Sequence, residues 1–331
     1  MKLSIGIVGL PNVGKSTLFT ILTKQNVTVA NYPFATIDPN VGVVPVPDER
    51  LEVLTKLSNS KKTIPAVVEF YDIAGLVKDA HKGEGLGNQF LANIRECKAI
   101  VQVVRCFKDS DIIHVEQTTN PVRDLDIILT ELIFKDLETV TKRLDKCEKE
   151  LRTGDKQAAH DAEVLRAVKV ALESGNLSRS FANEAIVREL SLLTAKEQIF
   201  LLNGDEEDVP LELKEKIAEY GGQYLIMNLG LADDVSPIIV KAYEALNLIS
   251  FLTTGEDETR AWTIERGAKA PEAAGAIHTD FEHKFIRAEV VNYSKLVEAG
   301  GWNQAKQKGW LRLEGKDYVV QDGDVMVIRH G

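Results

Sequence analysis

Residues Gly9-Leu-Pro-Asn-Val-Gly-Lys-Ser16 decide the fold of this chain. They follow the apolar run 3–8 and precede residues 17–24, which have a helical pattern, so the order is strand, glycine-rich loop and helix. The spacing G-x-x-x-x-G-K-S lets successive backbone N–H groups point at the phosphates of a nucleotide. Lys15 supplies a positive charge for the outer phosphates, and the Ser16 hydroxyl is a ligand for Mg²⁺. The motif therefore predicts an α/β domain of the phosphate-loop nucleotide hydrolases.

The length and composition of the chain indicate the class of protein in which this motif lies. The chain has 331 residues, enough for two or three domains, and its 44% hydrophobic and 27% charged content is typical of soluble globular proteins. No apolar run reaches the roughly 20 residues of a membrane span, and the N-terminus has no signal-peptide pattern, so we expect a cytoplasmic protein that makes no use of a membrane. Cys97, Cys106 and Cys147 form no C-x-x-C pair, which predicts reduced, mostly buried thiols rather than zinc ligands or disulfides. A net charge of −10 gives no global basic footprint for nucleic acid, so any RNA contact needs a local patch.

Two residues after the first helix are candidates for the rest of a Mg²⁺ site. Thr36 lies in the loop 31–40, which contains two prolines, and a threonine on such a loop closes on Mg²⁺ when the outer phosphate is present. The alternative is a turn or capping threonine. Asp72 ends the β-rich run 64–71 and is followed by Gly75, which is the pattern of a carboxylate that acts on the metal directly or through water.

The residues after Asp72 bear on the rate of hydrolysis. Many phosphate-loop GTPases have a glutamine after the glycine of D-x-x-G to orient the attacking water, and this chain has Leu76 there. Either another group orients the water, or hydrolysis is slow without a partner. His81, in the glycine-rich loop 80–90, is the candidate catalytic residue because an imidazole can orient or deprotonate water near neutral pH. The alternative is a solvated loop histidine.

The strand expected at 198–203 ends in Asn203-Gly-Asp-Glu206, where guanine-specific hydrolases have N-K-x-D. In that motif the aspartate accepts hydrogen bonds from the N1–H and amino group of guanine. Gly204 in place of lysine and Glu206 in place of aspartate should loosen guanine recognition, and the backbone of Gly204 is then available to the adenine amino group. The pattern favours ATP over GTP. The competing interpretation is a surface turn that does not touch the base.

A helical hairpin and a small C-terminal domain are also expected. Apolar residues in steps of four and three predict a coiled-coil seam that turns back after residues 153–155: Ile133, Leu137, Val140, Leu144, Cys147 and Leu151, then Ala162, Leu165, Val168 and Leu172. Basic residues on its distal half are interleaved with acids, which favours a solvated face over an RNA contact. Short β-rich runs after residue 248 predict an α+β domain. The expected domains are 1–130 with 195–246, an inserted hairpin at 131–194, and 247–331.

Several long strings together resemble the YchF family, the Obg-like ATPases, over essentially the whole chain. They are GLPNVGKST, NYPFATIDPN, YDIAGLVKDAHKGEGLGNQFL, RAWTIERGAKAPEAAGAIHTDFEHKFIRAEV and LEGKDYVVQDGDV. The resemblance implies an Obg-type G domain interrupted by a helical hairpin and followed by a TGS domain. It also implies ATP preference, slow hydrolysis that ribosomes stimulate, association with the ribosome, in particular its large subunit, and a regulatory role in translation or stress responses.

The resemblance assigns roles to individual positions of this chain. It places nucleotide contacts at Asn12, Val13, Gly14, Lys15, Ser16 and Thr17 and at the Asn203–Gly204 segment, with Ser16 and Thr36 on Mg²⁺. By similarity to hydrolases that use potassium, Asn12 would help to bind K⁺. One departure concerns the segment after Asn228, where the family has a small-residue base-binding loop and an acidic helical stretch that are absent here. Either the chain is genuinely shorter at this point, or residues are missing from the sequence.

These observations predict a Mg²⁺-dependent ATP-hydrolysing switch. One alternative is a GTPase of the Obg class. The other is a non-catalytic adaptor for the ribosome or RNA, in which nucleotide orders the domains and the hairpin or TGS domain contacts RNA.

Overall fold

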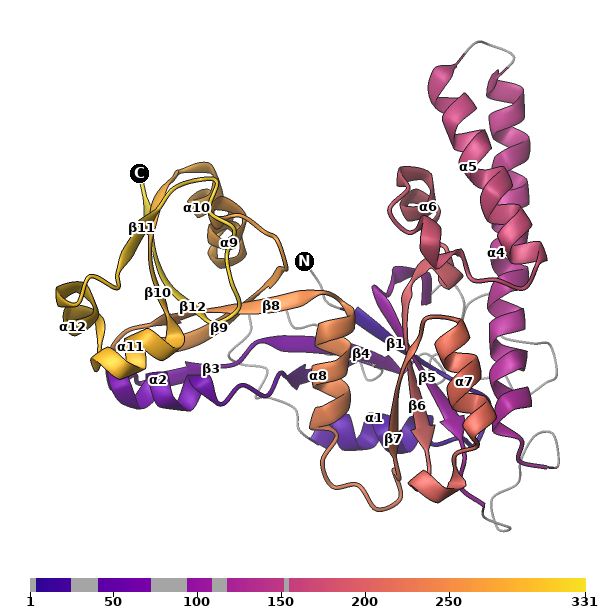
Figure 1. Cartoon of the computed structure of the whole chain (residues 1–331), viewed down its shortest axis with the longest axis horizontal. Helices are drawn as coiled ribbons and strands as arrows, with labels where there is room; N and C mark the ends of the chain where they lie inside the picture. Colours follow the sequence, from indigo (N-terminus) through magenta and orange to yellow (C-terminus); the bar gives the residue numbers. More distant parts are fainter. Residues whose placement is uncertain (1–3, 25–40, 73–93, 109–117, 152–154) are drawn as a thin grey trace. The chain divides into compact units, whose positions relative to one another are not determined.

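The computed structural model describes residues 4–24, 41–72, 94–108, 118–151 and 155–331 (Figure 1). The described residues form two compact units. Among the described residues, the first unit holds 4–24, 41–42 and those between 69 and 238, and the second holds 43–68 and 239–331. From the sequence we expected 43–68 within the nucleotide-binding domain, and the structure groups this segment with the C-terminal residues. Thr36 and His81 lie outside the described residues.

The sheet of the first unit places the carboxyl ends of five neighbouring parallel strands at one edge. Its strand order is β2-β4-β1-β5-β6-β7, and the pairs β4–β1, β1–β5, β5–β6 and β6–β7 are parallel. The strands are β2 (Val41–Pro45), β4 (Val67–Asp72), β1 (Ser4–Val8), β5 (Ala99–Arg105), β6 (Glu197–Asn203) and β7 (Gln223–Met227). Parallel strands buried on both faces read as continuous apolar runs, and every residue of β1 and β5 is buried. Ligands of such sheets bind outside the carboxyl ends of the strands.

Helices cover this sheet through their apolar stripes. α1 (Lys15–Lys24) buries Leu18 and Leu22, and α7 (Leu211–Glu219) buries Leu213 and Ile217 in one cluster with Phe200 of β6. The remaining short elements of this part of the chain are η3 (Ser178–Phe181), α6 (Ala185–Leu190), η4 (Leu193–Ala195), η5 (Glu206–Asp208) and α8 (Ser236–Ala245).

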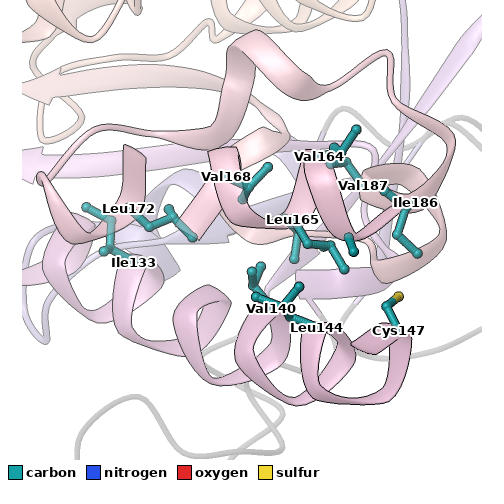
Figure 2. Packing of buried hydrophobic residues seen from close by; sticks show 12 residues of the cluster. Ile133, Val140, Leu144, Cys147, Val164, Leu165, Val168, Leu172, Ile186 and Val187 are labelled. Atoms are coloured by element: carbon teal, nitrogen blue, oxygen red, sulfur yellow. The ribbon is translucent and has the colours of Figure 1, made fainter. Parts of the chain in front are cut away.

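The expected hairpin is present and consists of α4 (Pro121–Leu151) and α5 (Lys156–Glu173). Its core contains the seam expected from the sequence, from Ile133 to Cys147 on α4 and from Ala162 to Leu172 on α5. Figure 2 shows Ile186 and Val187 of α6 in the same cluster, so a third, short helix packs against the pair. On its distal half Arg143 pairs with Glu150, and Lys146 lies 3.7 Å from the same carboxylate, so some of the interleaved acids and bases pair with one another.

A buried carboxylate fixes the base of the hairpin to the sheet domain. Asp136 of α4 is fully buried, and it accepts hydrogen bonds from the backbone N–H groups of Leu193 and Thr194 at 2.9 and 2.7 Å. The Thr194 hydroxyl adds a third donor at 2.7 Å. Burial raises the pKa of Asp136, and these hydrogen bonds oppose the rise. The chain therefore leaves α6 and enters β6 along a defined path.

The second unit has its own six-stranded sheet with the order β11-β10-β12-β8-β9-β3. Its strands are β11 (Arg312–Glu314), β10 (Phe285–Asn292), β12 (Asp324–His330), β8 (Leu248–Thr254), β9 (Glu258–Glu265) and β3 (Lys62–Ile64), and its helices are α2 (Arg50–Ser58), α9 (Ala270–Ile277), α10 (Thr279–His283), α11 (Tyr293–Ala299) and α12 (Trp302–Gln307). The α+β character expected for the C-terminal residues is confirmed.

Residues 43–68 are grouped with this unit through β3 and α2, although the strands at the two ends of the segment, β2 and β4, pair within the first sheet. β3 extends the sheet by pairing in parallel with β9. The Arg50 guanidinium donates to Asp48 at 2.8 Å and to Asp322 at 2.7 Å, which joins α2 to the turn before β12. These carboxylates raise the pKa of Arg50 above its already high value, so the pairs persist at all ordinary pH.

Two expectations from composition can be compared with this fold. Cys97, Cys106 and Cys147 are all buried, as expected, and no disulfide joins these three described residues. Within the ranges described above, the helices are all too short or too polar to cross a membrane.

Candidate nucleotide-binding site

The loop between β1 and α1 has the backbone geometry that its glycines predict. Gly9 and Gly14 have φ values of +151° and +107°, and a Cβ built on Gly14 would lie 2.4 Å from Nδ2 of Asn203. A side chain at either position would be strained, and at position 14 it would also collide with Asn203. Asn12 adopts φ 61°, in the left-handed region that asparagine tolerates better than most residues. The loop thus lies directly against the end of β6.

Lys15 is the first residue of α1 and lies almost entirely within the protein. Its side chain is 8% exposed, and Nζ donates to the carbonyl of Leu10 at 2.6 Å, across the loop. Burial lowers the pKa of Lys15 from 10.5 to about 8, while the carboxylate of Asp72 opposes this shift. Asp72 ends β4 and is itself 8% exposed. Strand ends therefore bring together a lysine and a carboxylate that are far apart in the sequence.

The lowered pKa predicts that the affinity for ATP depends on pH. The ammonium form, which attracts phosphate, is complete below pH 8 and is lost as the pH rises through 8. We expect the affinity for ATP to fall by about tenfold per pH unit above that point. Calorimetry from pH 7 to 9.5 measures this, and Lys15→Arg is the control because its guanidinium stays charged. A flat profile for the unmodified protein would contradict the predicted pKa.

Asn203 connects the phosphate loop to the rest of the site. It is 3% exposed, its Nδ2 donates to the Val13 carbonyl at 2.8 Å, and its Oδ1 accepts from the backbone N–H of Leu229 at 3.0 Å. Its carbonyl accepts from the N–H groups of Cys106 and Phe107. The side chain and the main-chain carbonyl of this one residue therefore connect the phosphate loop, the segment after β5 and the segment after β7.

A cavity of about 630 Å³ opens beside the loop. The phosphate loop and α1 contribute Asn12, Gly14, Lys15, Ser16 and Thr17; the segments after β5 and β6 contribute Phe107, Lys108, Asn203, Asp205 and Asp208; the connection after β7 contributes Asn228, Leu229 and Gly230. This volume is in the usual range for small-molecule sites. Of the residues expected from the sequence, the structure thus brings together Asn12, Gly14 to Thr17 and Asn203 around one cavity.

Val13, Gly204 and Glu206 were also expected to contact the nucleotide, and they do not line this cavity. Val13 is buried and presents its carbonyl to Asn203. Gly204 donates its N–H to the Met227 carbonyl at 3.2 Å, and a Cβ at this position would lie 3.0 Å from the nitrogen of Phe107. The carboxylate of Glu206 is bound to Nζ of Lys214 on α7.

Sequence reasoning missed the residues that the segments after β5 and β7 contribute. Phe107 follows the buried strand β5, and the guanidinium of Arg105 lies 4.5 Å from the centre of its ring. Asp205 receives Nδ2 of Asn228 on both oxygens, at 3.2 and 3.1 Å. Their position at the carboxyl ends of parallel strands was the available signal, because residues there converge on the ligand site.

Comparisons with known proteins agree on one family. A family model named YchF-GTPase_C, described as a protein of unknown function, matches residues 248–331, and a model described as 50S ribosome-binding GTPase matches residues 4–141. The chain is 46% identical to the ribosome-binding ATPase YchF of Bacillus subtilis, with 99% of each chain covered. It is 41% identical to Obg-like ATPase 1 of Gallus gallus, with 99% of this chain and 92% of the relative covered.

A solved structure and the length of one alignment give further detail of the similarity to this family. The structure of the Schizosaccharomyces pombe YchF GTPase superimposes with a TM-score of 0.88 at 39% identity, covering 99% of this chain and 98% of that one. The alignment with the Bacillus relative extends over 363 positions, more than the 331 residues of the chain, so it includes positions at which this chain has no residue.

Proposed function

The chain belongs to the YchF family, and we propose that it is an ATP-hydrolysing switch that binds the ribosome and holds ATP in the cavity beside its phosphate loop. The observation that carries the proposal is the buried Lys15 at the start of α1, next to a loop whose two glycines adopt positive φ and which lines the cavity. Its relatives are named ribosome-binding ATPases, which supports both the nucleotide and the partner.

The residues Asn12 to Thr17 hold the phosphates in this proposal. Backbone N–H groups at the start of α1 point along the helix axis toward the phosphates, where the helix dipole also favours negative charge. Lys15 leaves the Leu10 carbonyl and binds the outer phosphates, whose charge restores its ordinary pKa. These fixed charges stabilise the charge that develops on the transferred phosphoryl group while water attacks in line.

Ser16 and Asp72, with Thr36, are the proposed ligands of Mg²⁺. Ser16 lines the cavity, and Asp72 lies close enough to Lys15 to influence its pKa. The described residues contain no cluster of three His, Cys, Asp or Glu side chains, which fits an ion held by one hydroxyl, one carboxylate and the phosphates of the nucleotide. Mg²⁺ would neutralise phosphate charge there. Asn12, at the cavity wall, is the proposed contact for K⁺.

Phe107 is the proposed platform for the base. Guanine-specific hydrolases place a lysine at the position of Gly204, where a Cβ in this chain would lie 3.0 Å from the nitrogen of Phe107 and 3.2 Å from Cβ of Cys106, so a side chain would require these neighbours to shift. Phe107 is among the residues that line the cavity, and an aromatic ring can stack on either purine. Stacking alone does not distinguish adenine from guanine.

Turnover without a partner is expected to be slow, because Leu76 stands where a water-orienting glutamine is common. His81 remains the proposed group for that water. In this proposal residues 1–130 and 195–246 form the catalytic domain, except for 43–68, which group with the C-terminal unit, while the hairpin 131–194 and the TGS domain 247–331 contact the ribosome or its RNA. The site of action is then the cytoplasm.

The test is phosphate release from ATP by the purified full chain, measured with and without ribosomes, Mg²⁺ and K⁺. We expect slow release from ATP that requires Mg²⁺ and increases at least about tenfold with ribosomes. A rate of ATP hydrolysis that is the same with and without ribosomes would contradict the proposal that the chain is a ribosome-dependent switch. Failure to bind any nucleotide would contradict the use of the cavity altogether.

A further inference from the structure

Two neighbouring carboxylates follow β6, and the structure turns them in different directions. Glu206 occupies the position where N-K-x-D predicts the base-binding acid. Its carboxylate pairs with Lys214 of α7, and it is absent from the lining of the cavity. Asp205, one residue earlier, lines the cavity together with Asn203 and the phosphate loop. Of these two neighbouring acids, Asp205 lines the cavity and Glu206 does not.

The Asp205 carboxylate is held at the cavity by the short connection between β7 and α8. Nδ2 of Asn228 donates to both of its oxygens, at 3.2 and 3.1 Å, and Oδ1 of Asn228 accepts from the N–H of Gly230 at 3.1 Å. The backbone N–H of Asp205 donates to Asp208, which fixes the start of η5. An ionised carboxylate has about four lone-pair directions, so the bonds from Asn228 leave acceptor capacity for a ligand.

The connection that supplies Asn228 is only eight residues long, from the end of β7 at Met227 to the start of α8 at Ser236. At this place the YchF resemblance implies a base-binding loop that the sequence does not contain, and the alignment with the Bacillus relative has 363 positions against the 331 residues of this chain. Asn228, Leu229 and Gly230 form the cavity wall in its place. Base recognition in this chain therefore has a different set of groups to draw on.

A carboxylate at this place accepts hydrogen bonds and cannot donate them. Guanine offers it two adjacent donors, N1–H and the 2-amino group, whereas adenine offers the 6-amino group beside an acceptor at N1. We infer that Asp205, positioned by Asn228, recognises the base in this chain in place of Glu206, and that it lets the cavity accept GTP as well as ATP. The inference rests on the proposed function and specifies the nucleotides that the same site takes.

Asp205→Asn in the full chain, with calorimetric titration of ATP, GTP and xanthosine triphosphate, tests this inference. Xanthine carries an acceptor where guanine carries its 2-amino donor, so the amide of asparagine matches xanthine and mismatches guanine. We expect the unmodified protein to bind GTP within about tenfold of ATP. The variant should lose about tenfold in GTP affinity, gain about tenfold for xanthosine triphosphate, and keep its ATP affinity within about threefold.

The matched control is Glu206→Gln, which neutralises the neighbouring carboxylate outside the cavity and should change none of the three affinities by more than about threefold. The gain for xanthosine triphosphate cannot result from unfolding. A further measurement needs no variant: inosine triphosphate, which lacks the 2-amino group, should bind the unmodified protein about tenfold more weakly than GTP.

Four results would overturn the inference: no measurable GTP binding, equal affinity for inosine triphosphate and GTP, unchanged affinities in Asp205→Asn, or the same exchange of specificity in Glu206→Gln. Each leaves the proposed function standing if ATP still binds and is hydrolysed. Loss of binding for every nucleotide in the unmodified protein would instead remove the proposed function.

Discussion

Replacing Lys15 by alanine is expected to lower the affinity for ATP by at least about 100-fold and to reduce phosphate release to background. The ammonium group is held 8% exposed beside the loop, where its attraction for phosphate is little screened by water. The variant loses this charge, whereas it gains no strain, because alanine is the best helix former at the start of α1. Calorimetric titration and phosphate release measure the two effects.

Lys24→Ala is the matched control, because Lys24 ends the same helix and is exposed to solvent. It removes the same charge and should leave both measurements within about twofold. Retained phosphate release in Lys15→Ala would show that hydrolysis in the preparation does not use the loop at residues 9–16. The free energy of unfolding should increase in Lys15→Ala. Burial disfavours the charged form of Lys15, as its lowered pKa indicates, and alanine carries no charge to bury.

The sequence predicted the phosphate loop and the hairpin because both depend on short-range patterns. The loop requires glycine at two positions with positive φ, and the strand and helix that flank it have clear apolar patterns. The hairpin seam repeats every three or four residues, and Leu144, Val168 and Leu172 all lie in its core. Family membership follows from several such segments in order, and the comparisons confirm it.

Residues 43–68 show where local patterns do not suffice. β3 has only three residues, and nothing in Lys62, Thr63 and Ile64 indicates that they pair with residues 258–260, almost 200 positions later. The ion pair between Arg50 and Asp322 likewise joins distant positions. Such contacts depend on how whole elements pack, and the composition of the segment was compatible with either domain.

The residues of the candidate site also divide into those that a local motif predicts and those that only the folded sheet brings together. Residues of the loop were found because their spacing is fixed by the chemistry of phosphate binding. Phe107, Asp205 and Asn228 come from three strand ends that meet only after the sheet has formed. Phe107 and Asn228 lie in no motif, and Asp205 occupies the variable position of the stretch compared with N-K-x-D. Glu206 was favoured over Asp205 by alignment to a motif, and its pairing with Lys214 could not be foreseen from spacing alone.

Asn203 is the residue through which these segments depend on one another. It touches the phosphate loop, the end of β5 and the connection after β7, and each of its side-chain polar atoms has a partner within the protein. A nucleotide that orders the phosphate loop therefore also fixes the wall that carries Asp205, because both are attached to the same amide. This coupling predicts that a substitution at Asn203 lowers the affinity for all nucleotides by the same factor.

Asn203→Ala is accordingly expected to lower the affinities for ATP and GTP equally, by about tenfold or more. The variant leaves the Val13 carbonyl and the Leu229 N–H without partners in an almost fully buried setting, which costs about 1–3 kcal/mol for each group that water does not reach. Hydrogen exchange provides a second readout, because the amide of Leu229 should exchange faster in the variant once its acceptor is removed.

Two further variants make this prediction specific. Asn203→Asp keeps an acceptor for Leu229 but places a second oxygen against the Val13 carbonyl, so it should bind nucleotide no better than Asn203→Ala. Asn176→Ala, an exposed asparagine of the same unit, should bind like the unmodified protein. If Asn203→Ala lowered the affinity for only one of the two nucleotides, Asn203 would be contacting the base itself. In that case the specificity assigned to Asp205 would have to be shared between the two residues.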